Sequence, residues 1–500
     1  MEAERYGWKV NRTAPNDWST SSMTAGFDGT GAPIAALWAY LSSWLSPDGG
    51  VNGPVVHRGD LKRMFSIHDT PWTQHGVIAG LLHLYRRSGR AYWLDNALKL
   101  ADAQCARLEA DGRFRWAGHE DDRFSSLVHN ALADCALLDV AAVLECAGGD
   151  PRRDRYLRVA ETNLEHYIVD VLYRRELTGF VMNPVDYYAG RDRFVVNMNS
   201  VALEALVKLD QQRGTTRHLS RVQAVGDRIL ELQTRDGPCR GSFPYSDLEP
   251  DTHIPLYTAL AIRGFPALAD LRQDTTWAEA AKQAAAFLDR ARDVETGFWC
   301  HKFEPDRVYR FPFFVAGAGM ICNGMLDAAE VTGEAIDVAS LIDLLLRHQY
   351  GNGAIRNFIG YDHPDNGGFR SGVGATCWED AFPTPNWNAQ AFHFLCRVLP
   401  PPDPPDQTNN TTPATVMSVS NRYLYRETEN LALIVGTWPP GTTVFAFYVK
   451  RLRYGFLVPG FLMTVRVLRK VVERSAMGRV VLSRLRTVVG KARESRGDRA

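Results

Sequence analysis

The sequence has no CxxC pair, although it contains eight cysteines in 500 residues. Without paired spacing, these cysteines match neither a zinc ribbon nor the disulfide framework of a small secreted domain. The opening residues, MEAERYGWKVNRTAPNDW, lack the basic and apolar segments of a signal peptide. We therefore expect a cytoplasmic protein with reduced, mostly buried thiols.

The chain also lacks a net charge, because 57 Lys and Arg balance 57 Asp and Glu. This balance gives no indication of a nucleic-acid partner, and we expect none. No aspartate-rich DDxxD or DxDD motif occurs. A terpenoid-cyclase-like protein is therefore a weak alternative, although several loops are aromatic.

A repeated pattern of helices fills most of the chain. Residues 111–145 show the unit: a turn with glycine, a short aromatic run, a polar cluster, and a helix from near Phe124 that is apolar on almost every face. Such a helix should be buried all round. We expect about twelve helices in six pairs, with half-exposed outer helices alternating with apolar inner ones. Turn signals recur at the same phase, at residues 48, 111, 178, 236, 296 and 352.

Hairpins of this kind either stack as an open solenoid or close into a ring. Six pairs with strongly apolar inner helices favour the ring, so the sequence predicts an all-α fold, an (α/α)6 toroid. At roughly residues 30–399 the chain resembles the six-hairpin glycosidase-like (α/α)6-barrel superfamily. A surface segment at 1–29 precedes the toroid. A Pro-rich linker at 400–416 and a basic, apolar region at 417–500 follow it.

The resemblance implies a cleft built by the loops that enter the inner helices. These loops carry the carboxylates, imidazoles, amides and flat aromatic rings that sugar chemistry needs. We predict Asp122 and Asp380 as the acid/base or nucleophile pair. The supporting catalytic candidates are Glu379, His68, Asp69 and His119. The substrate-binding candidates are Glu120, Trp72, Asn199, Asp251, His253, Tyr257, Arg310, Trp378, Trp387 and Asn388.

Simpler structural roles compete with several of these assignments. Asp69 precedes Thr70 and Pro71 and can cap a helix, and Asp122 can balance the dipole of the helix that follows. His129 lies on an apolar helix, where a core histidine is more common than an acid or base.

Cys239, Cys300 and His301 form the one candidate metal set. A similar ring in the lanthionine cyclases holds zinc with two cysteines and a histidine. The glycine-rich flanks of that family are absent here, where the sequence reads GPCRG and FWCHKF. We therefore predict no metal and no cofactor, and keep zinc as a minor alternative.

The C-terminal region differs from the rest in charge, with 14 Lys and Arg against 3 Asp and Glu from Lys450 onward. Basic residues beside apolar ones suit an amphipathic helix on an anionic membrane surface. A partner-binding or partly disordered tail explains the same charges.

Together these features predict a carbohydrate-active enzyme that cleaves or modifies an oligosaccharide or glycoconjugate. The basic C-terminal region adds a glycan linked to the inner membrane face as a candidate substrate. A glycoside hydrolase and a uronate lyase or epimerase are both consistent with the pattern. The alternative is a non-catalytic toroid that binds a glycan or a protein.

Overall fold

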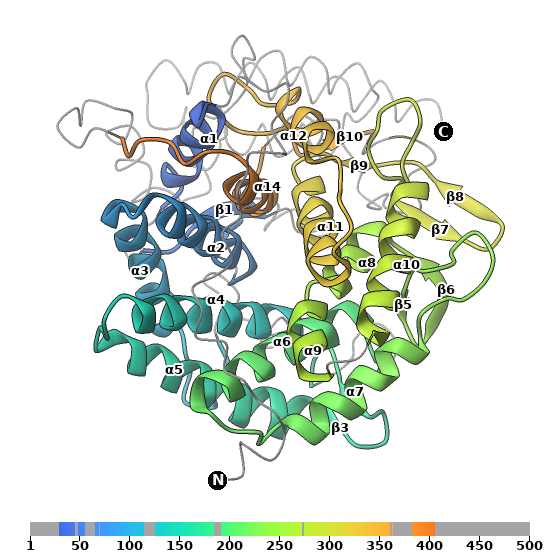
Figure 1. The fold of residues 1–500 in the computed structure, drawn as a ribbon, viewed down its shortest axis with the longest axis horizontal. Helices are drawn as coiled ribbons and strands as arrows, with labels where there is room; N and C mark the ends of the chain where they lie inside the picture. Colours follow the sequence, from blue (N-terminus) through green and yellow to red (C-terminus); the bar gives the residue numbers. More distant parts are fainter. Residues whose placement is uncertain are drawn as a thin grey trace, which may run out of the picture.

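The structure, a computed structural model, describes residues 30–45, 49–55, 66–69, 71–114, 126–184, 192–272, 275–360, 363 and 383–405. Within these ranges the helices form two concentric layers, as Figure 1 shows. The inner layer consists of α2 (Pro71–Ser88), α4 (Leu127–Cys146), α6 (Val196–Arg213), α8 (Pro255–Ile262), α11 (Ala318–Thr332) and α14 (Pro385–Val398). The outer layer consists of α1 (Ala32–Ser42), α3 (Ala91–Cys105), α5 (Arg152–Asn163) with the π-helix η4 (Leu164–Leu172), α7 (Leu219–Glu231), α10 (Thr276–Arg290) and α12 (Val338–Leu346). The predicted all-α toroid of six pairs is confirmed.

The two layers follow from the apolar pattern of their helices. The inner helix α4 buries residues on every face, including Leu132, Cys135 and Leu138. The outer helix α7 buries a single stripe, which includes Val222, Val225 and Ile229. Among the described residues, only α4 is long and apolar enough to cross a membrane, and 78% of its apolar window is buried inside the protein. Its composition is therefore that of a core helix.

A turn at the same phase of each pair links the outer helix to the inner one. In five of the six predicted turns the glycine has φ between 70° and 89°, a region that side chains with a Cβ rarely adopt. In the sixth, Thr178 has a positive φ of 45°. Isolated antiparallel bridges close several of these turns, for example Leu108 with Phe114 and Gln349 with Ile355.

An amide on the inner helix holds the turn in place. Asn130, Asn199 and Asn388 are each the fourth residue of their helix. Their side-chain oxygens accept the backbone N–H of Phe114, Phe180 and Ile355 at 3.0, 2.8 and 2.6 Å. Their Nδ2 atoms donate to the carbonyl four residues earlier, at 3.0 Å in each case. We call these three residues the amide clamps, because each ties the start of an inner helix to the turn before it.

Helix α14 closes the ring between the first and fifth inner helices. Glycines let it approach both neighbours closely: a Cβ on Gly76 of α2 would lie 2.9 Å from the Ala389 oxygen. A Cβ on Gly319 of α11 would lie 2.4 Å from the Ala391 Cα. The chain ends of the toroid therefore meet at backbone contact distance.

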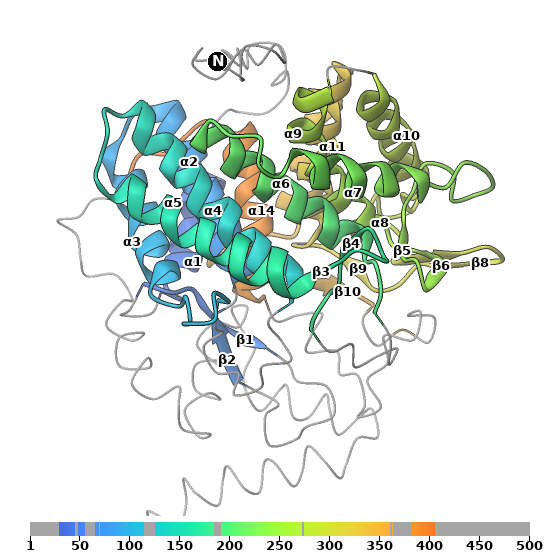
Figure 2. The ribbon, with the colours of Figure 1, turned by 90° about the horizontal axis from the view of Figure 1, so that it is seen from below.

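Short strands, which the helical pattern did not predict, lie between the helices. Strands β5 (Pro244–Ser246), β6 (Glu249–His253), β7 (Lys302–Glu304) and β8 (Arg307–Tyr309) form one antiparallel sheet. Three further pairs are β1 (Asn52–Val55) with β2 (Ser66–Asp69), β3 (Tyr173–Arg174) with β4 (Gly179–Phe180), and β9 (Phe313–Phe314) with β10 (Phe358–Ile359). Figure 2 shows the strands toward one end of the ring and the short helix α9 (Phe265–Arg272) toward the other.

The close approach of α11 and α14 makes Gly319 sensitive to substitution. We expect Gly319→Ala to lower the free energy of unfolding by about 1–3 kcal/mol, because the added methyl meets backbone that cannot move aside. Gly351→Ala is the matched control, since nothing lies within 4 Å of its added Cβ. Denaturant unfolding of both variants measures the difference, and equal stabilities would contradict the packing.

Candidate functional site

A cavity of about 290 Å³ lies on the axis of the ring. All six inner helices and α9 contribute to its lining, and its polar and aromatic lining residues include Trp72, His83, Glu204, Arg263, His393 and Arg397. Arg86 and Glu330, near the ends of α2 and α11, are exposed, whereas Met320 and Gln390, near the starts of α11 and α14, are buried. The cavity therefore opens at the end of the ring where the inner helices finish, opposite the strands.

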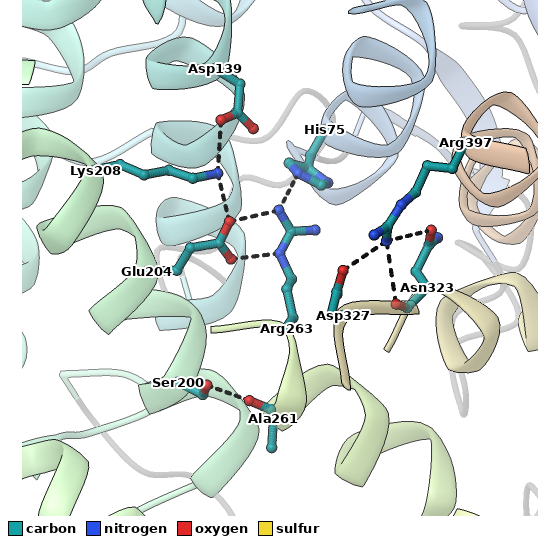
Figure 3. Close-up of polar contacts among 10 residues, drawn as sticks. All are labelled: His75, Asp139, Ser200, Glu204, Lys208, Ala261, Arg263, Asn323, Asp327 and Arg397. Atoms are coloured by element: carbon teal, nitrogen blue, oxygen red, sulfur yellow. Dashed lines mark hydrogen bonds and ion pairs between the residues drawn. The ribbon is translucent and has the colours of Figure 1, made fainter. Parts of the chain in front are cut away.

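A chain of ion pairs crosses one wall of this cavity (Figure 3). Lys208 Nζ donates to Asp139 Oδ1 at 2.8 Å and to Glu204 Oε1 at 2.7 Å. Arg263 donates from Nε to Glu204 Oε2 at 2.7 Å and from Nη2 to Glu204 Oε1 at 3.1 Å. Its Nη2 also donates to His75 Nε2 at 2.8 Å. Glu204 thus lies between two cations, and one of these holds a histidine.

These contacts fix the charge state of Glu204. Burial alone would raise the pKa of this carboxyl, but Arg263 and Lys208 outweigh burial and hold the pKa below its ordinary value. Burial opposes the charge of both cations, but Glu204 keeps the pKa of Arg263 above its ordinary value, and Asp139 together with Glu204 does the same for Lys208. Glu204 is therefore ionised, with both oxygens bonded, and is unsuited to deliver a proton.

The position of Arg263 depends on a break in the fourth inner helix. Helix α8 ends at Ile262, and the short helix α9 begins at Phe265. Pro266 has no N–H to continue the helix, and a Cβ on Gly264 would lie 2.6 Å from the Ser200 oxygen. The break leaves Arg263 at the end of α8, beside the axis.

A second ion pair lies across the cavity. Arg397 Nη1 donates to Asp327 Oδ1 at 2.7 Å and to the backbone and side-chain oxygens of Asn323, both at 3.3 Å. Glu330 lies 3.9 Å from Arg397 Nη2. Glu330 is half exposed, and its partial burial and the nearby Asp327 raise the pKa of its carboxyl. On this side of the cavity, Asp327 is therefore tightly paired with Arg397, whereas Glu330 is only loosely paired with it.

Three histidines lie close together beside these pairs. His83 and His393 stack with ring centroids 5.5 Å apart, and His75 lies edge-on to His393 at 6.0 Å. Burial lowers the pKa of all three imidazoles well below the ordinary value, and nearby arginines lower it further. They are therefore neutral near pH 7, and His83 and His393 line the cavity directly.

Several predicted substrate-binding residues have structural partners. Asn199 and Asn388 are amide clamps, whose side chains are committed to the backbone. Arg310 pairs with Asp293 and Glu295 at 2.7 and 2.6 Å, and the His253 ring lies 2.9 Å from Ser242 Oγ. Tyr257 packs against Tyr245, and Asp251 is exposed on β6. None of these residues lines the axial cavity.

Two predicted tryptophans do lie together. Trp72 and Trp387 meet edge to face at 4.6 Å, and Phe314 packs against Trp387 at 5.0 Å. Trp72 also lines the cavity. These rings therefore form an aromatic cluster at the starts of α2 and α14.

The predicted acidic residues lie elsewhere in the chain. Asp122, Asp380, Glu379, His119, Glu120 and Trp378 lie outside the described residues. For His68 and Asp69 the structure describes the backbone, which forms part of β2, and not the side chains. Within the described ranges, Cys239, Cys300 and His301 do not form a group that could hold a metal ion. The cleft at the loops thus stays a prediction.

Sequence reasoning missed the charged groups on the axis. A signal was present, because Glu204 and Lys208 interrupt the apolar helix NMNSVALEALVKL four residues apart, and Arg263 ends the apolar run IPLYTALAI. A charge on a helix that is otherwise buried all round must have a partner inside the ring.

The axial ion pairs give a stability prediction. We expect Glu204→Gln to lower the free energy of unfolding at pH 7 by about 3–5 kcal/mol, because two buried cations lose their shared anion. Because the pKa of Glu204 is lowered in the folded protein, the advantage of wild type should be lost as pH falls below the ordinary value of 4.5. Denaturant unfolding at several pH values measures both effects.

The control for this variant is Glu334→Gln, which removes an exposed ion pair with Lys282. An exposed pair contributes about 0–1 kcal/mol, so a similar loss in both variants would contradict the role assigned to Glu204.

Comparisons with known proteins support the architecture. No family model matches the chain, and no curated protein matches it. Among solved structures it is similar to cellobiose 2-epimerase from Bacillus thermoamylovorans B4167, with 13% identity, a TM-score of 0.52, and coverage of 73% of this chain and 98% of that chain. A D-mannose isomerase shares 13% identity at a TM-score of 0.53, covering 73% of this chain and 96% of that one.

A family 76 α-mannanase from Bacteroides thetaiotaomicron is similar to the same extent. It shares 12% identity at a TM-score of 0.53, over 73% of this chain and 94% of that chain. Identities this low establish the fold alone. This chain therefore has the (α/α)6 toroid fold that these proteins share.

Proposed function

We propose that this protein is a carbohydrate-active enzyme that works in the axial cavity. The observation that carries the proposal is the cavity itself, where His83, His393 and Trp72 share one lining with ordered ion pairs. Proteins of the same fold include an epimerase, an isomerase and a mannanase, so a sugar is the natural first candidate. Fold likeness alone would not carry this step.

The size of the cavity supports a small substrate. Its volume of 290 Å³ is that of roughly ten water molecules in the liquid, and it lies at the lower end of the volume range of ligand pockets. Trp72 offers a flat apolar surface for a sugar face, and the charged groups offer hydrogen bonds to hydroxyls. We therefore infer one sugar residue in the cavity rather than a long chain.

The lining favours proton transfer by imidazole. Glu204, Asp139 and Asp327 are each bonded to a cation at 2.8 Å or less, so they are poorly suited to act as acid, base or nucleophile. His83 and His393 are neutral and side by side. One imidazole can remove the proton beside the carbonyl of an open-chain sugar, which leaves an imidazolium and an enediolate. The imidazolium then returns the proton to carbon, either directly or after passing it to the second, neutral imidazole. The reaction that this lining supports best is an epimerisation or isomerisation.

Hydrolysis or elimination by loop carboxylates is the second candidate. It assigns the chemistry to Asp122 and Asp380 and makes the axial cavity a subsite for one sugar residue. The α-mannanase of the same fold supports this alternative. A membrane-linked glycan stays a prediction of the C-terminal region, which lies outside the described residues.

Isotope exchange separates these candidates. We expect wild-type protein, incubated with hexoses and hexuronates in D2O, to place deuterium on a sugar carbon, as seen by NMR and mass spectrometry. His393→Asn should slow the exchange about 10²–10⁴-fold, because the variant lacks one of the two acid/base groups. His166→Asn, an exposed histidine of η4, is the control and should keep the wild-type rate.

Other outcomes each name a different function. A parallel incubation with oligosaccharides and uronate-containing glycans covers the second candidate: products of lower mass that have gained water identify a hydrolase, and unsaturated products that absorb in the near ultraviolet identify a lyase. If His393→Asn turns over like wild type, the imidazole mechanism is wrong. Binding of sugars with no turnover of any kind would support the non-catalytic toroid.

The lowered pKa values predict the pH dependence. His393 acts only while one ring nitrogen is unprotonated, and burial together with His83 and Arg397 lowers its pKa well below 6.5. Because protonation then requires more acid, kcat/KM should stay constant from pH 7 to pH 6.5 and fall only at lower pH. Initial rates across this range test it, and an acid limb centred at or above 6.5 would contradict it.

A further inference from the structure

Arg263 has hydrogen-bond donors that its protein partners do not use. A guanidinium carries five N–H groups, and the contacts to Glu204 and His75 occupy the three on Nε and Nη2. Among the described residues, Nη1 has no partner. In Figure 3 it points away from Glu204, toward the side of the cavity where Asp327 and Arg397 lie. The side chain is only 15% exposed, and it lines the cavity.

The other charges around the cavity leave this edge available. Asp139 is paired with Lys208, and Asp327 is paired with Arg397. Glu330 at the mouth lies 3.9 Å from Arg397, and its pKa is raised by partial burial. Arg86, also at the mouth, has no ion pair with any described residue. Four cations therefore face four carboxylates, of which three are tightly paired and Glu330 is not.

A buried cation with unused donors calls for an acceptor. Glu204 holds Arg263 through two bonds, so the Nη1 edge is fixed before any ligand arrives and little entropy is lost on binding. Guanidinium groups bind carboxylate and phosphate oxygens with charge-assisted bonds about twice as strong as bonds between neutral groups. The hydroxyls of a neutral sugar would use this edge less well.

We propose that the axial cavity takes a monosaccharide that carries an oxyanion, either a carboxylate or a phosphate, and that the Nη1 edge of Arg263 binds this group. The proposal rests on the proposed function, since it names the substrate class of the same cavity. Arg263 also holds His75, which lies edge-on to His393, so the anchored group and the imidazoles share one rigid wall. Arg263 is then a specificity-determining residue.

Titration calorimetry on the full-length protein tests this directly. The probes are D-glucuronate, D-galacturonate, D-mannuronate and D-glucose 6-phosphate, each compared with the matching neutral hexose. We expect at least one acidic sugar to bind about tenfold or more tightly than its neutral counterpart, and the carboxylate and phosphate arms identify the group. Equal affinity within every pair, or no binding of any acidic sugar, would overturn the proposal.

Variants assign the preference to one side chain. Arg263→Lys keeps a cation for Glu204 but removes the Nη1 edge, so the ratio of the affinity for the acidic sugar to that for its neutral counterpart should fall about tenfold. Arg397→Lys is the matched control in the same cavity, because Nη1 of Arg397 is already committed to Asp327 and Asn323, and its preference should persist. The opposite pattern in these two variants would overturn the assignment.

A second variant covers a failure of Arg263→Lys to fold. In the double variant Glu204→Gln/Arg263→Gln the buried ion pair becomes a pair of amides, which leaves neither partner as an unpaired charge. It should also lose the preference for acidic sugars, and a retained preference would again contradict the proposal. Turnover of neutral sugars alone would support the proposed function without this substrate class. Selective binding of acidic sugars without turnover would support the binding site at Arg263 and contradict the proposed enzymatic function.

Discussion

Burial of charge on the ring axis is the constraint on which the rest of the site depends. Glu204 is only 6% exposed, and such a carboxylate is tolerable because Arg263 and Lys208 bond both of its oxygens. This requirement fixes where α6 and α8 can lie relative to each other. It also determines the orientation of the guanidinium, and through it the tautomer of His75, whose Nε2 accepts a hydrogen bond. The Nη1 edge of Arg263, which we propose as the binding edge, is thus oriented by the bonds that Arg263 makes to the buried Glu204.

The ring can hold this cluster because its own geometry is repeated and tight. The amide clamps Asn130, Asn199 and Asn388 tie the starts of three inner helices to the turns before them in the same way. Gly76 and Gly319 let α14 pack against both neighbours at backbone distance. Loss of an amide clamp would leave a buried backbone N–H without a partner, at a cost of about 1–3 kcal/mol. Precise placement of side chains on the axis therefore depends on contacts far from it.

The sequence predicts the fold well and the described site poorly, for physical reasons that differ. Helical periodicity and the recurring glycine turns reflect local preferences, so the six pairs could be read directly. The break after Ile262 and the convergence of Glu204, Arg263 and His75 depend on residues from three helices meeting on an axis. Asn199 and Asn388 were predicted to bind substrate, and in the structure their side chains bond backbone groups, a pairing that the sequence alone does not reveal. The sequence feature that indicated the axial cluster was a charged residue, such as Glu204, within an otherwise apolar inner helix.

The same burial acts in opposite ways on the two kinds of titratable group in the cavity. The buried carboxylates stay ionised because cations bond them. Such carboxylates are suited to holding other side chains in position. Imidazoles that are buried here lose their charge instead, and a neutral ring can still accept and return a proton. We therefore infer that the charged groups bind and select the sugar, whereas His83 and His393 transfer protons. A hydrolytic role for this protein would need carboxylates outside this cluster, since those within it are committed to cations.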